Sequence, residues 1–126
     1  MVILKEIRNE LLRLHKTLMD IERGNHEAEH GKVTNVQLLN LLFEHENFIW
    51  LREISGLVTD VDELLASKKG IDQAEANRLF AKAKVLFDEG EEFQEFKQKY
   101  QANLDTETDV SFHHVKIKKL LAKEKA

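Results

Sequence analysis

The chain has 126 residues, no cysteine and no proline, and 33% of its residues are charged. A chain of this length can bury a hydrophobic core without the help of disulfides or a structural metal, so we expect one domain over residues 1–126. Because it lacks cysteine, it has neither disulfides nor metal sites with thiolate ligands. Lys5, Glu6, Arg8 and Glu10 stand where a signal peptide needs an apolar run, and no apolar stretch approaches the roughly 20 residues of a membrane span. These features predict a cytoplasmic protein that does not span a membrane.

The charges are unevenly distributed along the chain. Residues 115–126 contain five lysines and one glutamate, a balance of +4, so the net charge of -4 leaves -8 on residues 1–114. Nucleic-acid binding needs a broad basic face, which an acidic body does not provide. We expect no nucleic-acid partner, and interpret the lysines as the solvated face of a last helix, where they oppose the negative end of its dipole.

The first segment predicts a long helix. Apolar residues recur at spacings of three and four, which places them on one face of an α-helix, and the series comprises Ile3, Ile7, Leu11, Leu14, Leu18 and Ile21. Gly24 weakens the interior of this helix without necessarily breaking it, whereas Gly31 is suited to cap it. The first helix is therefore expected over about residues 2–30.

Two further helices are expected before the middle of the chain. Thr34 and Gln37 form a capping box before "VQLLNLLF", so a short helix should run to near His45. Because it is apolar almost all round, it should be buried as a wedge under its neighbours. Asn47 can cap a third helix, which should continue to about residue 68.

The second half of the sequence predicts three more helices. Asp72 and Glu75 form a second capping box for a fourth helix, which should end near Gly90. A narrow, largely aromatic stripe over residues 93–104 predicts a fifth helix, and the last helix should begin at residue 108 or 109. The short connections favour antiparallel neighbours. We therefore expect an all-α fold, an up-and-down antiparallel bundle of five to six helices.

The third predicted helix contains a run that resembles a known pattern. Phe48, Trp50, Leu51, Arg52, Ser55 and Leu57, followed by Asp62, Glu63 and Leu64, form this run. It is similar to a Phe-x-Trp-Leu-Arg-x-x-Ser-x-Leu segment of uncharacterised families of small bacterial all-helical proteins. The resemblance implies a helical bundle and no established activity.

The third predicted helix has Ile49 and Gly56 on the side opposite its core face. An apolar residue and a glycine there predict a second, close contact with the second helix or a partner chain.

Polar residues of the first and third helices form the best candidate for a site. The apolar stripe of the first helix gives way to polar residues at its end, and Arg52 stands at the margin of the third helix that faces the first. The candidate cluster comprises Glu22, Asn25, Glu29, Arg52, Ser55 and Asp62. We expect Arg52 to pair with Glu22 or Glu29, since a buried charge needs a partner. Alternatively, the end of the first helix extends beyond the bundle into solvent.

Metal and catalytic motifs are incomplete. Glu22, His26 and Glu29 have spacings that can converge on one ion, but carboxylate-bridged bundles need Glu-x-x-His motifs on two helices, and hemerythrin-like bundles need a histidine-rich pattern. The sequence contains no phosphate-binding loop, nucleophile elbow or cysteine nucleophile. His15 and His45 fit structural roles at helix margins. We predict no metal, no cofactor and no catalytic residue.

Three classes of function remain. A non-enzymatic interaction or regulatory module, with a protein partner or a homo-oligomer, fits an acidic helical domain without motifs best. The alternative is a bundle that binds a small ligand or metal through the polar cluster between the first and third helices. An enzyme of unrecognised type has the least support.

Overall fold

The computed structural model describes residues 2–123, and every regular element in that range is a helix. The seven helices are α1 (Val2–His30), α2 (Asn35–Glu44), α3 (Glu46–Ile49), α4 (Arg52–Leu65), α5 (Gln73–Phe87), α6 (Gln94–Thr106) and α7 (Thr108–Lys123). The predicted all-α class is confirmed, and the bundle has one helix more than the largest number expected.

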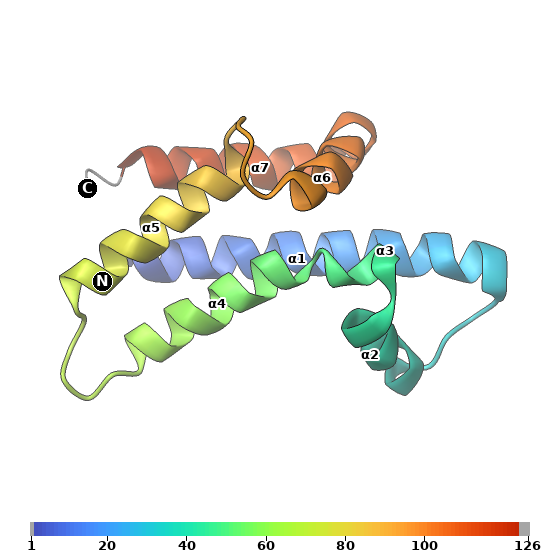
Figure 1. The fold of residues 1–126 in the computed structure, drawn as a ribbon, viewed down its shortest axis with the longest axis horizontal. Helices are drawn as coiled ribbons and strands as arrows, with labels where there is room; N and C mark the ends of the chain where they lie inside the picture. The colour runs from blue at the N-terminus through green and yellow to red at the C-terminus, as the bar shows by residue number, and fades with distance from the viewer. Residues whose placement is uncertain (1, 124–126) are drawn as a thin grey trace.

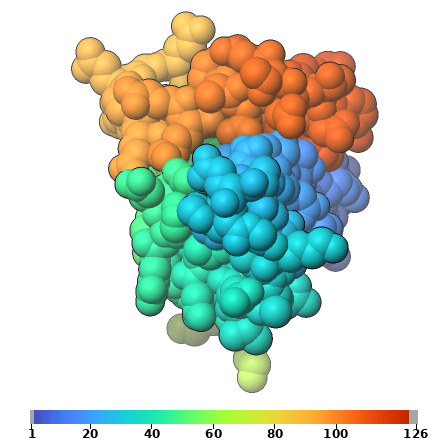
Figure 2. All heavy atoms as spheres, turned by 90° about the vertical axis from the view of Figure 1, so that its right-hand side faces the viewer, coloured from blue at the N-terminus to red at the C-terminus, as the bar shows by residue number. Residues whose placement is uncertain are grey.

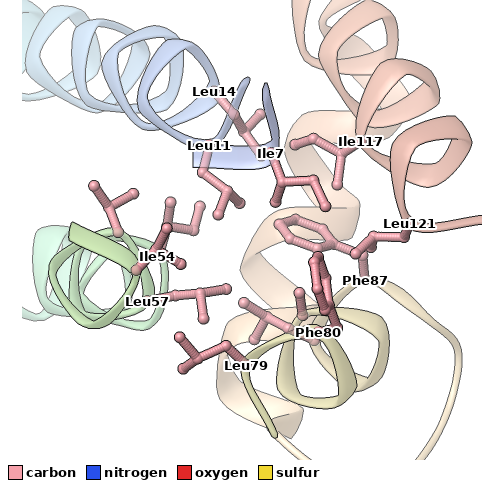
Figure 3. Packing of buried hydrophobic residues seen from close by; sticks show 14 of the residues in the cluster. Ile7, Leu11, Leu14, Ile54, Leu57, Leu79, Phe80, Phe87, Ile117 and Leu121 are labelled. Atoms are coloured by element: carbon pink, nitrogen blue, oxygen red, sulfur yellow. The ribbon is translucent and has the colours of Figure 1, made fainter. Parts of the chain in front are cut away.

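Four helices surround the core. α1 runs the length of the molecule and packs against α4 and α7, both antiparallel to it, and α5 closes the group by contacting α4 and α7 (Figure 1). Their apolar side chains point toward one another between the helices (Figure 3). Leu11 and Leu14 of α1 and Ile54 of α4 are fully buried there. The apolar stripe predicted for the first helix is therefore the centre of the core.

The first helix keeps its predicted bounds. It passes through Gly24 and ends at His30, where Gly31 takes a positive φ of 86° and donates its N–H to the carbonyl of Glu27 at 2.8 Å. A glycine adopts this conformation without the steric cost of a Cβ atom. Gly31 thus turns the chain into the connection that leads to α2.

The predicted third helix is divided in two, because a side chain takes one of its backbone acceptors. The Trp50 Nε1–H donates to the carbonyl of Asn47 at 2.9 Å, and the Leu51 N–H bonds Phe48 O at 3.0 Å instead. α3 is capped by His45 rather than by Asn47, whose N–H donates to His45 Nδ1 at 3.1 Å. The chain remains right-handed through the break, and α4 ends at Leu65, earlier than predicted.

The fourth and fifth predicted helices also differ in detail. Asp72 caps α5 by accepting the Ala74 N–H at 2.9 Å, whereas the Glu75 side chain pairs with Arg78 at 2.5 Å, so the capping box is one-sided. α5 ends at Phe87 instead of near Gly90. Phe93, which precedes α6, has a left-handed backbone with φ 57° and directs the chain into that helix.

Candidate functional site

α2 is a short helix with well-defined ends. The predicted capping box is present: the Gln37 N–H donates to Thr34 Oγ1 at 3.2 Å, and the Thr34 N–H donates to Gln37 Oε1 at 2.8 Å. At the other end the His45 N–H donates to Leu41 O at 2.9 Å. These bonds satisfy backbone groups that the helix itself leaves free.

The outer face of α2 is apolar and exposed. Val36, Leu39 and Phe43, which we call the α2 stripe, are 70%, 53% and 59% exposed. Their spacing of three and four residues places them along one side of the helix. Residues 33–43 contain no ionisable side chain, although one third of the chain is charged. The prediction of a buried wedge is therefore wrong, because no other helix within residues 2–123 covers this side.

The inner face attaches α2 to the molecule. Leu38 is buried and Leu42 packs against the core, while the helix as a whole contacts mainly α3. The preceding connection is bound to α1, because Arg23 Nη2 donates to Val33 O at 2.6 Å and the Val33 N–H donates to Glu27 Oε2 at 2.8 Å. In Figure 2, α2 lies in the lower part of the face, away from α6 and α7 at the top. The stripe is held at one end of the bundle.

Arg52 lies beside this stripe rather than in the predicted cluster. Its guanidinium donates to the carbonyl of Phe43 and lies 5.8 Å from the centre of the Phe43 ring. The side chain is exposed. Within the described residues, the predicted ion pair with Glu22 or Glu29 is not formed, and the Arg52 guanidinium is bonded to the backbone carbonyl near the end of α2 instead.

The other predicted site residues are not brought together. Asp62 pairs with Arg8 of α1, with Oδ1 2.7 Å from Nε and Oδ2 3.3 Å from Nη2. Ser55 is half-buried, and its carbonyl accepts the Thr59 hydroxyl at 3.0 Å. Asn25 is exposed. Asp62 is therefore paired with Arg8, a residue outside the predicted cluster.

The acidic residues near the end of α1 are also separated. Glu29 is exposed and lies 3.5 Å from Nε2 of the neighbouring His30. Glu22 is half-buried, and this burial raises the pKa of its carboxyl group against the opposing effects of Lys99 and His45. The two carboxylates are thus in different environments, so a solvated end of α1 describes Asn25 and Glu29 but not Glu22.

Three histidines gather where α1 meets α3. The ring centres of His26 and His30 are 4.6 Å apart, and those of His26 and His45 are 5.4 Å apart. His45 Nδ1 accepts the Asn47 N–H, so this nitrogen is occupied. Over residues 2–123, no group of three histidine or carboxylate side chains is arranged to hold a metal ion.

Sequence reasoning missed a buried carboxylate between α1 and α7. Glu10 is only 6% exposed; its Oε1 accepts Arg13 Nη1 at 2.6 Å, and its Oε2 lies 3.4 Å from His113 Nδ1. The interval of three residues from Glu10 to Arg13 on one helix gives a local signal. The contact with His113, by contrast, depends on how α7 packs on α1.

A second polar pair faces a groove between the last three helices. Tyr100 Oη and His114 Nδ1 are 2.8 Å apart, and both line an open groove of about 1220 Å³. Burial raises the pKa of the Tyr100 hydroxyl and lowers the pKa of the His114 imidazole, an effect that Lys118 reinforces. Both groups are therefore neutral near pH 7, which suits a structural hydrogen bond better than acid-base chemistry.

Comparison of the chain with protein-family models, curated proteins and solved structures finds no match. None of the helices in residues 2–123 combines the length and apolar character needed to cross a bilayer. The candidate site thus depends on the geometry of the chain itself, and its most distinctive element is the α2 stripe.

Proposed function

We propose that the protein is a non-enzymatic helical interaction module that docks a partner on the α2 stripe. The observation that carries this proposal is the exposure of Val36, Leu39 and Phe43 on a helix with no ionisable side chain before its last residue, Glu44. Isolated exposed apolar residues are ordinary, whereas adjacent ones mark interaction surfaces. Covering apolar area from water releases about 25 cal/mol per Å², so a partner that covers the stripe gains affinity from it.

The geometry of the stripe supports helix-mediated docking. Anchors spaced at three and four residues are the pattern by which an amphipathic helix packs against another helix or into a groove. Arg52 fixes the end of the stripe through the carbonyl of Phe43. Its guanidinium also offers a charged margin beside the ring. The surface thus combines an apolar centre with a polar edge, as protein interfaces do.

Another exposed apolar pair provides a comparison. Phe112 and Val115 of α7 are 58% and 50% exposed, but Lys116 Nζ lies 4.4 Å from the centre of the Phe112 ring. Lys119 follows on the same helix and is exposed. The lysines stand between and after the apolar residues of α7 itself, whereas α2 has no charged residue among its apolar ones. The ligand-binding alternative has less support, because its polar cluster is dispersed.

Photo-crosslinking in cells that produce the protein tests the proposal. A benzophenone amino acid replaces Asn40, which is exposed on α2 beside the stripe, or Glu63, which is exposed on α4 as a control. We expect a discrete crosslinked product from position 40 and none from position 63. The product should disappear when the three stripe residues are changed to serine.

A matched control separates the α2 stripe from apolar exposure in general. The double variant Phe112→Ser, Val115→Ser removes two equally exposed side chains from α7 and should leave the crosslink at position 40 intact. A crosslink that survives the three serine substitutions in α2, or no crosslink at position 40, contradicts the proposal.

A further inference from the structure

We infer that the partner of the α2 stripe is the α2 stripe of a second copy of the chain, packed antiparallel about a two-fold axis. This inference rests on the proposed function and names the occupant of the surface. A two-fold contact requires a surface that complements itself. The spacing, the charges and the central polar residue of α2 each meet this requirement.

The stripe is symmetric along the helix. A two-fold axis placed between Leu39 and Asn40 sets Val36 opposite Phe43 of the second copy, because each lies three and a half residues from the axis. The small Val36 then faces the large Phe43 at both ends. Leu39 meets the centre of the other helix. Alternating small and large side chains in this way lets two helices approach closely.

The charges around α2 favour the antiparallel direction. Lys32 precedes the helix and Glu44 is its last residue, with no ionisable side chain over residues 33–43 between them. Antiparallel packing places Glu44 of one copy near Lys32 and the positive helix end of the other. Parallel packing would instead bring like charges together. At the Glu44 end, Glu46 and Arg52 have opposite charges and leave this complementarity unchanged.

Asn40 fits the centre of such a pair. It is exposed beside the stripe, and a two-fold axis next to it brings the two Asn40 side chains within one residue of each other along the helices. A carboxamide both donates and accepts hydrogen bonds, so two of them can pair. A single asparagine in a helix interface fixes register and orientation in coiled coils. Asn40 would set the register here.

The size of the surface predicts a weak dimer. Ten helical residues are about 15 Å long, and three side chains cover much less than the about 800 Å² per partner of a standard stable interface. We therefore expect monomers at about 1 µM and dimers as the concentration approaches about 1 mM. Association of this strength suits a contact that forms only where the protein is concentrated.

Sedimentation equilibrium tests the inference directly. Between about 1 µM and about 1 mM, the average mass of the full chain should rise from 14.7 kDa toward twice that value. Phe43→Glu should abolish the rise, because it places a carboxylate in the contact, while Phe112→Ser, Val115→Ser should leave it unchanged. Circular dichroism should show equal helix content in all three proteins.

The absence of cysteine permits a second, geometric test. Asn40→Cys introduces a single thiol next to the proposed axis, and Glu63→Cys introduces one on α4. Under mild oxidation, position 40 should form a disulfide-linked dimer at least about tenfold faster than position 63, since thiolate attack requires proximity. Adding Leu39→Lys should remove this difference.

The results separate the two proposals. A chain that stays monomeric at about 1 mM, with equal oxidation rates at positions 40 and 63, overturns the inference. A position-40 photo-crosslink to a different protein then leaves the proposed function standing, whereas no crosslink at that position removes both. A crosslink between two copies, together with the mass increase, supports both.

Discussion

α1 and α2 both carry large apolar side chains at helical spacing, but those of α1 are buried and several of those of α2 are exposed to solvent. Leu11 and Leu14 are completely buried, whereas Leu39 and Phe43 are more than half exposed. α1 has one apolar face, and α4 and α7 cover it. α2 is apolar on two sides, and the part of the chain that the structure describes covers only the inner one. Periodicity therefore identifies a face, while the number of neighbouring helices determines whether it is buried.

The largest expected effect concerns Trp50, a core residue between α3 and α4. The indole is buried, its ring centre lies 5.5 Å from that of Phe96, and its N–H donates a hydrogen bond to the carbonyl of Asn47. Trp50→Ala should lower the free energy of unfolding by about 3 to 5 kcal/mol in urea titrations. Phe43→Ala is the matched aromatic control and should change it by no more than about 0.5 kcal/mol. Equal losses of unfolding free energy would show that Phe43 contributes to the core as much as Trp50 does.

The buried Glu10 should show a smaller effect. Glu10→Ala leaves Arg13 and His113 without their shared acceptor and should reduce the free energy of unfolding by about 1 to 3 kcal/mol. Glu10→Gln keeps one acceptor and similar volume, so its loss should be smaller. Chemical denaturation of both variants measures this. If both are as stable as the wild type, the carboxylate does not contribute to the α1–α7 contact.

The core should also respond to mild acid. Burial lowers the pKa of His15 and His114 below the usual 6.5, so the folded state takes up these protons less readily than the unfolded chain. Stability should therefore fall as the pH drops below about 6.5, until the depressed folded-state pKa values are passed. His15→Gln, His114→Gln should flatten this dependence in thermal melts at several pH values. If the pH dependence of stability is unchanged in this variant, groups other than these two histidines cause it.

Ion pairs give the smallest expected differences. A double-mutant cycle of Arg52 with Glu22 should yield a coupling below about 0.5 kcal/mol, because Arg52 bonds the carbonyl of Phe43 instead. The cycle of Arg8 with Asp62, measured in the same buffer, should give the larger coupling, since their side chains meet at 2.7 Å. The reverse order would restore the predicted polar cluster.

The helices were predictable where local chemistry determines them. The bounds of α1 and α2 follow from the Leu periodicity, the capping box at Thr34 and the glycine at Gly31. The break between α3 and α4 was not predictable, because it depends on the Trp50 side chain reaching a backbone carbonyl. Local patterns do not show which rotamer tertiary packing selects.

The candidate site was predictable only in part. Arg52 and Asp62 were recognised as polar residues at the edge of a core helix. Their partners depend on how other elements pack against α4, which brings Arg8 of α1 to Asp62 and the carbonyl of Phe43 to Arg52. The exposure of α2 was also missed, since an apolar helix is ordinarily buried. The proposed function depends on this exposed surface.

One stability measurement tests most directly whether the α2 stripe serves association rather than folding. The variant Val36→Ser, Leu39→Ser, Phe43→Ser is compared with the wild type by urea unfolding at about 1 µM, where the proposed dimer is dissociated. Side chains that are already exposed contribute little to the core, so the two unfolding free energies should agree within about 1 kcal/mol. A loss comparable to that expected for Trp50→Ala, about 3 to 5 kcal/mol, would show that the stripe is part of the folded core and would contradict the account.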